Sequence, residues 1–226
     1  MIPTDEPHLR HAPATVHGRY LVLPARGDTR HWLIGFHGQA QTAEIFLESL
    51  ARVPRGAGWL VASVQGLNRY YAGRTQQIVA HWMTRQDREY AITDNVAYVD
   101  TVCDQLELEF GPPRAIVFAG FSQGVAMAYR AGLLGRHQCA AVVAACGDVP
   151  PELVEIENRA WPRVLAVTGS GDEWYTRARL EQDLALLRSR RVDVRSQVFT
   201  GGHEWSDEVA RAVGGLLTEV ESATGG

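Results

Sequence analysis

One serine of the sequence lies between two glycines at a spacing that suits nucleophilic catalysis, in Gly120-Phe121-Ser122-Gln123-Gly124. A hydroxyl group is a weak nucleophile, so it needs a neighbouring base and must protrude far enough for a carbonyl group to approach it. A sharp turn between a strand and a helix meets the second need. Such a turn requires small residues around the serine because larger side chains would collide. The pentad therefore predicts that Ser122 is a nucleophile.

The segments on either side of the pentad have the pattern that this turn requires. An apolar run, residues 114–119, comes before it, and residues 125–134 after it have a helical pattern. A glycine-rich turn before a packed helix is the alternative interpretation. A strand, a turn and a helix in this order are typical of the nucleophile turn of the α/β-hydrolase fold.

In that fold the acid and then the histidine follow the serine along the chain. Only His137 and His203 come after Ser122. His137 follows a predicted helix and is expected at the surface, whereas His203 follows the last predicted strand and two glycines. Because those glycines give the loop freedom to bring the imidazole to Ser122, we expect His203 to be the general base.

The acid has two candidates, each at the end of a predicted strand. Asp172 follows the strand that comes just before the one leading to His203, and Asp148 follows the preceding strand. The acid must orient the imidazole and stabilise its protonated form. The chain order favours Asp172, and Asp148 is left as a turn residue or a substrate contact.

Acyl transfer places negative charge on the former carbonyl oxygen, and two backbone N–H groups usually receive it. One comes from the residue after the nucleophile, which is Gln123, and the other comes from the loop after an earlier strand. His37-Gly38-Gln39 occupies that loop, so the Gln39 N–H is the second predicted donor. For His37, a structural role in hydrogen bonding the loop is favoured over catalysis.

Several aromatic residues lie beside these elements along the chain. Trp82 and Tyr71 belong to a long segment before the pentad, Trp174 follows Asp172 and Trp205 follows His203. Aromatic rings lining a pocket would suit an apolar acyl or aryl group. These four are the predicted substrate-binding residues, with ordinary packing as the alternative for each.

Strands that alternate with helices must position these side chains. Predicted strands cover residues 16–23, 31–36, 59–64, 114–119, 140–145, 164–167 and 192–199. Predicted helices cover 42–52 (capped by Thr42), 90–110, 125–134, 177–190 and 204–220. Residues 1–14 are expected to be a loosely ordered arm, and 66–88 a long irregular loop. Because the middle strands are apolar on both faces, we expect a mostly parallel sheet with helices on both faces, in a single domain of residues 1–226.

The composition excludes several classes of protein. The net charge of −4 is spread without any block of five or six like charges, so no nucleic-acid partner is expected. No run of 18 apolar residues occurs, so no integral membrane segment is expected. The polar start lacks the apolar region of a signal peptide, which favours a cytoplasmic protein. The oligomeric state stays open, and a homodimer is one choice.

The cysteines and histidines carry no metal motif. Cys103, Cys139 and Cys146 form no CxxC pair and lie among apolar neighbours, so free thiols are expected, with one disulfide as the alternative. Neither HExxH nor a spaced cluster of His, Cys and Asp is present, so no metal or other cofactor is predicted.

Taken together, the pentad, Phe36-His37-Gly38, Gly171-Asp172 and Gly202-His203 resemble the phospholipase/carboxylesterase family, which includes the acyl-protein thioesterases. The resemblance covers roughly residues 31–220, and the pentad is its most specific part. It implies a compact hydrolase with little or no lid that acts on small carboxylic esters or thioesters. It also implies a triad of Ser122, Asp172 and His203, with Gln39 and Gln123 as oxyanion donors.

The sequence departs from that family at two places. Val125 stands where the family usually has a second glycine after the pentad, and the loop after Gly38 continues as Gln39-Ala40-Gln41 instead of with Gly and Asp. An acyltransferase or a peptidase with the same triad, and a non-catalytic binding protein on the same fold, remain alternatives to the esterase.

Overall fold

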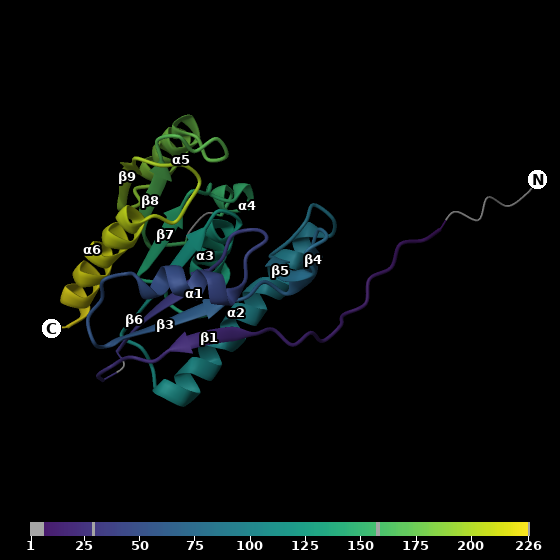
Figure 1. Ribbon diagram of the computed structural model, residues 1–226, viewed down its shortest axis with the longest axis horizontal. Helices are drawn as coiled ribbons and strands as arrows, with labels where there is room; N and C mark the ends of the chain where they lie inside the picture. Colours follow the sequence, from purple (N-terminus) through teal and green to yellow (C-terminus); the bar gives the residue numbers. More distant parts are fainter. Residues whose placement is uncertain (1–6, 29, 157–158, 226) are drawn as a thin grey trace, which may run out of the picture.

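A seven-stranded sheet forms the centre of the computed structural model, which describes residues 7–28, 30–156 and 159–225 (Figure 1). The strands lie in the order β1-β3-β2-β6-β7-β8-β9, and all neighbours except β1 and β3 are parallel. Their bounds are β1 (Tyr20–Leu23), β2 (His31–Phe36), β3 (Trp59–Val64), β6 (Ala115–Phe121), β7 (Ala141–Ala145), β8 (Arg163–Gly169) and β9 (Val194–Phe199). The prediction of a mostly parallel sheet is confirmed.

Helices cover both faces of this sheet (Figure 1). One face carries α1 (Ala43–Ala51) and α6 (Asp207–Thr224), and the other carries α2 (Arg88–Phe110), α3 (Gln123–Leu134) and α5 (Arg177–Ser189). Neighbouring strand residues alternate between the two cores. Within β2, Leu33 packs with the α1 and α6 side, whereas Trp32 and Ile34 pack with the α2, α3 and α5 side. Since both faces are buried, the middle strands are apolar throughout.

The strand order reverses next to β2. From this strand the sheet continues to β3 on one side and to β6, β7, β8 and β9 on the other. In open parallel sheets, ligands bind beyond the carboxyl ends of the strands where such a reversal occurs. Phe36 at the end of β2 is in register with Gly120 near the end of β6. The loop after β2 and the turn at Ser122 therefore leave the sheet side by side at this point.

The segment predicted as a long irregular loop, residues 66–88, contains a β-hairpin instead. β4 (Asn68–Ala72) pairs with β5 (Gln77–His81) in an antiparallel ladder outside the main sheet, and Figure 1 shows it projecting from the body of the molecule. Nearly all of β4 is exposed. The alternation of apolar and polar residues that marks a half-buried strand is therefore weak, and the pattern does not reveal the hairpin.

Two further elements differ from the sequence prediction. β1 begins at Tyr20 instead of residue 16, and a short helix, α4 (Pro151–Val154), lies between β7 and β8. Residues 7–19 of the N-terminal arm are exposed and have no regular secondary structure, while residues 1–6 lie outside the described part. His11 attaches the arm to the body through a 3.0 Å contact with the Asp87 carboxylate.

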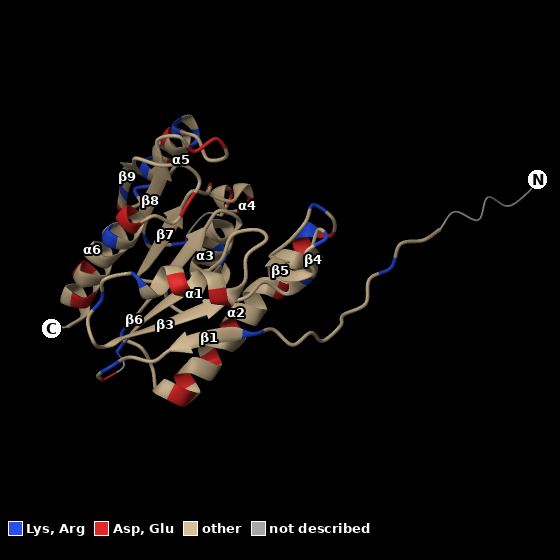
Figure 2. Cartoon of the chain, in the orientation of Figure 1, with Lys and Arg blue, Asp and Glu red and all other residues tan. Residues whose placement is uncertain are grey.

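No helix in the described ranges is long and apolar enough to cross a bilayer. Basic and acidic residues are interspersed along the ribbon in Figure 2. Cys103, Cys139 and Cys146 are free thiols, as predicted.

The start of α3 lies in direct contact with the end of β2. A Cβ atom at Gly124 would lie 1.9 Å from the Phe36 carbonyl oxygen, and one at Gly120 would lie 2.3 Å from the Gly124 carbonyl oxygen. Both obstacles are backbone atoms, which cannot rotate away. The two glycines of the pentad are therefore required by the packing of β2, β6 and α3.

Gly124→Ala is expected to lower the free energy of unfolding by about 2 kcal/mol or more, because the added methyl group forces two elements apart. Gly215→Ala is the matched control. Gly215 is also helical, but it is exposed and a Cβ there would meet no atom within 4 Å. Gly215→Ala is therefore expected to raise the free energy of unfolding by about 0.5–1 kcal/mol. Urea unfolding measures both. An unchanged midpoint for Gly124→Ala would contradict the contact with β2.

Candidate active site

Ser122 occupies a strained turn between β6 and α3. Its backbone has φ 52° and ψ −121°, a conformation that residues with side chains rarely adopt. Its N–H donates to the Ala145 carbonyl at 2.9 Å, which ties the turn to the end of β7. A Cβ at Gly147 would lie 2.6 Å from the Ser122 carbonyl oxygen and 2.7 Å from Val125, so a glycine is needed beside this turn too.

Ser122, His203 and Asp172 form one hydrogen-bonded line. His203 Nε2 lies 2.8 Å from Ser122 Oγ, and His203 Nδ1 lies 2.8 Å from Asp172 Oδ2. A carboxylate can only accept, so Nδ1 carries the proton and donates it to Asp172. Nε2 is then an acceptor for the Ser122 hydroxyl proton. This arrangement has the geometry of a nucleophile, a general base and an orienting acid.

Asp172 is buried, yet its surroundings favour the ionised form. Burial alone would raise the pKa of Asp172, but the N–H groups of Tyr175 and Trp174 and the ring of His203 donate to it and hold the pKa below its ordinary value. Both N–H groups reach Asp172 Oδ1 at 2.8 Å. Asp172 therefore keeps a negative charge beside the imidazole, which stabilises the protonated form of His203.

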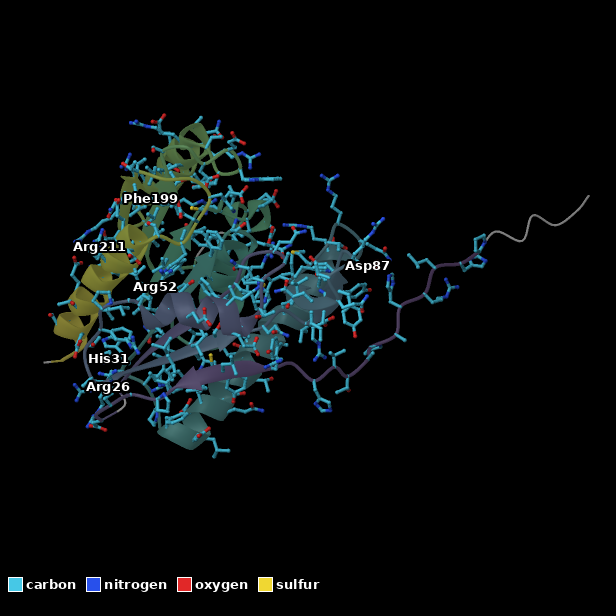
Figure 3. All side chains as sticks on the ribbon, viewed as in Figure 1. Arg26, His31, Arg52, Asp87, Phe199 and Arg211 are labelled. Carbon is cyan, nitrogen blue, oxygen red and sulfur yellow. The ribbon has the colours of Figure 1, made fainter. Side chains whose placement is uncertain are left out.

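The loops that carry Asp172 and His203 are fastened to each other. The Gly171 N–H donates to the Gly201 carbonyl at 2.8 Å, and a Cβ at Gly169 would lie 2.2 Å from the Gly202 carbonyl oxygen. Arg52, labelled in Figure 3 at the end of α1, donates to the Trp205 carbonyl at 3.3 Å. These contacts fix the position of the histidine loop from both sides.

The two predicted oxyanion donors lie at the same edge of the sheet. No carbonyl or side-chain acceptor within the described ranges takes a hydrogen bond from the backbone N–H of Gln39 or Gln123. Gln39 is exposed, and Ala40 after it has a φ of 61°. A Cβ at Gly38 would lie 3.0 Å from Phe121, so the Gln39 loop passes close to the Ser122 turn. Both N–H groups are free to bind an oxyanion.

His37 holds the Gln39 loop in place. The Gly66 N–H donates to His37 Nε2 at 3.0 Å, so the ring proton is on Nδ1, which donates to the Gly38 carbonyl at 2.7 Å. Burial lowers the pKa of His37, which keeps the ring neutral. On the far side of the loop, the Ala40 N–H donates to Ala80 of the hairpin at 3.0 Å. His37 has the structural surroundings that the sequence favours.

The side chain of Gln123 links the turn to the segment after the hairpin. Its Oε1 accepts from the Trp82 N–H at 2.9 Å, and its Nε2 donates to the Met83 carbonyl at 3.0 Å. The Trp82 indole in turn donates to the His37 carbonyl at 2.8 Å. One glutamine thus presents its backbone N–H to the site and joins the hairpin to it through its side chain.

The aromatic residues predicted to bind substrate are in two different environments. Trp82 is fully buried beneath the Gln39 loop, and Trp205 is 7% exposed with its ring packed against Phe46. For these two rings the structure supports the alternative of ordinary packing, because rings with these contacts brace the loops. Trp174 and Tyr71 are exposed, on the acid loop and on the hairpin, and can meet a ligand.

The other candidate residues lie elsewhere. Asp148 is exposed and forms no hydrogen bond with His203 in the described structure, whereas Asp172 does. His137 lies at the opposite end of the sheet and pairs with Asp104 at 2.9 Å. The fold therefore brings Asp172, and not Asp148, to the histidine.

Two residues that the sequence analysis does not single out support the acid loop. The Tyr175 hydroxyl donates to Asp183 Oδ2 at 2.7 Å, and the Val149 N–H donates to the same oxygen at 3.1 Å. The Tyr175 carbonyl accepts from Thr168 at 2.8 Å. Asp183 on α5 therefore ties the loop of Asp172 to the loop after β7. No short motif reports such a contact, since its members are far apart in sequence.

The sequence matches no family model and no curated protein sequence. Many solved structures are similar to it. They include esterase PE8 (22% identity, TM-score 0.69, covering 91% of this chain and 100% of that chain) and acyl-protein thioesterase 2 of Zea mays (16%, 0.73, 90% and 99%). A carboxylesterase from Mesorhizobium loti is also similar (18%, 0.74, 90% and 95%). With the parallel sheet and the turn at Ser122, this similarity shows that the chain has the α/β-hydrolase fold.

The partly buried Asp183 predicts a pH dependence of stability. Burial raises the pKa of Asp183, although the Tyr175 hydroxyl and the Val149 N–H act in the opposite direction. Stability that depends on the neutral carboxyl is complete below the unfolded pKa and is lost as the pH rises through the folded pKa, by about 1.4 kcal/mol per unit of difference. The wild type should therefore lose stability relative to Asp183→Asn as the pH rises from the acid range to neutrality.

Urea unfolding across this pH range measures the free energy of unfolding of both proteins. Subtracting the value for Asp183→Asn from that of the wild type removes the contribution of all other groups. Tyr175→Phe is the control that keeps the carboxyl group and removes one of its donors, so the fall should occur at a higher pH. A stability difference that is constant with pH would contradict the raised pKa.

Proposed function

We propose that this protein is a serine hydrolase that cleaves carboxylic ester or thioester bonds through an acyl-enzyme intermediate. The observation that carries the proposal is the hydrogen-bonded line from Asp172 through His203 to Ser122, with both contacts at 2.8 Å and the serine in a strained turn. A packed serine has no need of this backbone conformation, so the strain argues for a functional role.

The geometry suits each step of acyl transfer. His203 Nε2 accepts the Ser122 proton as Oγ attacks the acyl carbonyl, and Asp172 stabilises the imidazolium that forms. The negative charge on the former carbonyl oxygen is received by the N–H groups of Gln39 and Gln123. The imidazolium then gives its proton to the leaving alcohol or thiol. A water molecule, deprotonated by His203, releases the acid from Ser122.

The kind of acyl bond is inferred from two observations. Similar solved structures include two carboxylesterases and an acyl-protein thioesterase. Trp174, whose N–H donates to Asp172, is an exposed aromatic residue and suits a substrate with an apolar side. The His203 side chain is 22% exposed, so water can reach the acyl-enzyme. This favours hydrolysis over transfer of the acyl group to another acceptor.

The state of the cysteines is an argument about the cellular compartment of the enzyme. All three are free thiols, two of them fully buried. Free thiols persist in reducing compartments. They therefore favour a cytoplasmic enzyme.

Activity on short-chain aryl esters, with fluorophosphonate labelling of the serine, tests the proposal. Wild-type protein should hydrolyse the esters and be labelled once per chain. Ser122→Ala should lose the label and lower kcat by a factor of about 10⁴ or more, because no other residue in the described ranges offers a hydroxyl to His203. A folded wild type that is neither active nor labelled would exclude a catalytic role. Full activity in Ser122→Ala would assign the nucleophile elsewhere.

The acid is tested by two matched aspartate variants. Asp172→Asn keeps the shape of the side chain but leaves His203 with the wrong tautomer, so kcat at neutral pH should fall by about 10⁴. Asp148→Asn, next to the same loops but exposed, should stay within about 3-fold of the wild type. Equal losses in both variants would contradict the assignment of Asp172.

A further inference from the structure

One side chain near Asp172 and His203, that of Cys146, has a chemical group that metal ions bind. Cys146 directly follows β7, has a φ of 56° and is 1% exposed. Its thiol sulfur, an Asp172 carboxylate oxygen and a His203 ring nitrogen all lie within 4.8 Å of one another. The three residues come from loops after three neighbouring strands, so only the folded sheet assembles them.

The acyl-transfer steps do not use this thiol. They involve the Asp172 carboxylate, both ring nitrogens of His203 and Ser122 Oγ. Burial and the adjacent Asp172 raise the pKa of Cys146 to about 12. The proton on this thiol is therefore one that a metal ion must displace in order to bind the sulfur.

A thiolate sulfur, an imidazole nitrogen and a carboxylate oxygen are each donor types that bind zinc in proteins. Their charges also suit a divalent cation. Among the described residues, Asp172 forms no ion pair with an arginine, and its only ionic partner is His203. A carboxylate and a thiolate together would neutralise one divalent cation, and a buried cluster without net charge avoids much of the desolvation cost of an unpaired ion.

We propose that Cys146, Asp172 and His203 bind a thiophilic divalent cation, with Zn²⁺ as the chemical type, and that binding switches off the hydrolase. The metal-binding half stands on the geometry alone, while the inhibition rests on the proposed function. Water takes the fourth position of the tetrahedron.

Metal binding would move one proton within His203 and release one proton from Cys146. The metal replaces the proton on His203 Nδ1, and that proton moves to Nε2 through a change of tautomer. The Cys146 thiol releases its proton to solvent, and Asp172 exchanges its hydrogen bond for a bond to the metal. With Nε2 protonated, His203 can no longer accept the proton of Ser122. The general base is therefore lost while Ser122 itself is unchanged.

The distances require only a local adjustment. Ligand atoms about 2.0–2.3 Å from a tetrahedral zinc lie roughly 3.3–3.7 Å apart. The Nδ1 to Oδ2 pair at 2.8 Å must therefore open by about 0.5–1 Å, and the sulfur must approach. Because Gly171 and Arg52 hold the histidine loop in place, this opening must come from rotation of the imidazole and the carboxylate about their own side-chain bonds.

Co²⁺ is the first probe, because a thiolate bound to Co²⁺ gives a charge-transfer absorption band in the near ultraviolet. Chelator-treated protein is titrated with Co²⁺ and its absorption recorded. The wild type should give the band, and Cys146→Ser should not. Cys103→Ser is the matched control and should keep it, since Cys103 is also buried near carboxylates, those of Asp100 and Asp104, but is not part of the ligand cluster.

Zn²⁺ is the second probe and tests the effect on the reaction. For each protein, the rate of ester hydrolysis with Zn²⁺ is compared with the rate of the same protein without metal. Zn²⁺ should inhibit ester hydrolysis by the wild type and by Cys103→Ser, and EDTA should restore the rate. The inhibition constant should be at least about 10-fold higher in Cys146→Ser. Cys146→Ala serves as a second variant should the serine protein fail to fold.

Two results would overturn the site: no thiolate band in the wild type, or the same inhibition constant in the wild type and in a folded Cys146 variant. A band without any esterase activity in metal-free protein would support the metal site and overturn the proposed function instead. The two proposals can therefore fail separately.

Discussion

The backbone of Ser122 is held at φ 52° and ψ −121°, a conformation that costs on the order of 1–3 kcal/mol for a residue with a side chain. The neighbouring strands and helix prevent its relaxation. Its N–H is bound by Ala145, its carbonyl accepts from the Val125 N–H at 3.0 Å, and Gly124 brings α3 against β2. The hydroxyl protrudes because β2, β6, β7 and α3 meet at this one turn.

The loops around the turn depend on one another as much as on the sheet. Trp82 connects the hairpin, the Gln39 loop and Gln123, since its backbone N–H donates to Gln123 and its indole donates to His37. Tyr175 and Asp183 have the same function for the acid loop. Such groups hold the proposed oxyanion donors, Gln39 and Gln123, and the Asp172 loop in place, which suits a site that must be preorganised.

The departures from the family pattern have local explanations. Val125 is fully buried, and Gly147 provides the space beside it that a smaller residue after the pentad would otherwise provide. In the other departing segment, Ala40 adopts a left-handed conformation, and the Gln41 side chain accepts from the Gly38 N–H at 2.9 Å. The His203 side chain is 22% exposed, so solvent reaches the hydrogen-bonded line.

The sequence by itself determined the alternation of strands and helices, the turn at Ser122 and the chain order of Ser122, Asp172 and His203. These are local properties, since the hydrophobic period and small residues act over a few positions. Only the tertiary structure decided which aspartate meets His203, that Trp82 and Trp205 are buried, that residues 66–88 contain a hairpin, and that Cys146 lies beside the acid. Each of these depends on strand register and on packing between loops, and such contacts between distant segments leave no periodic signal along the chain.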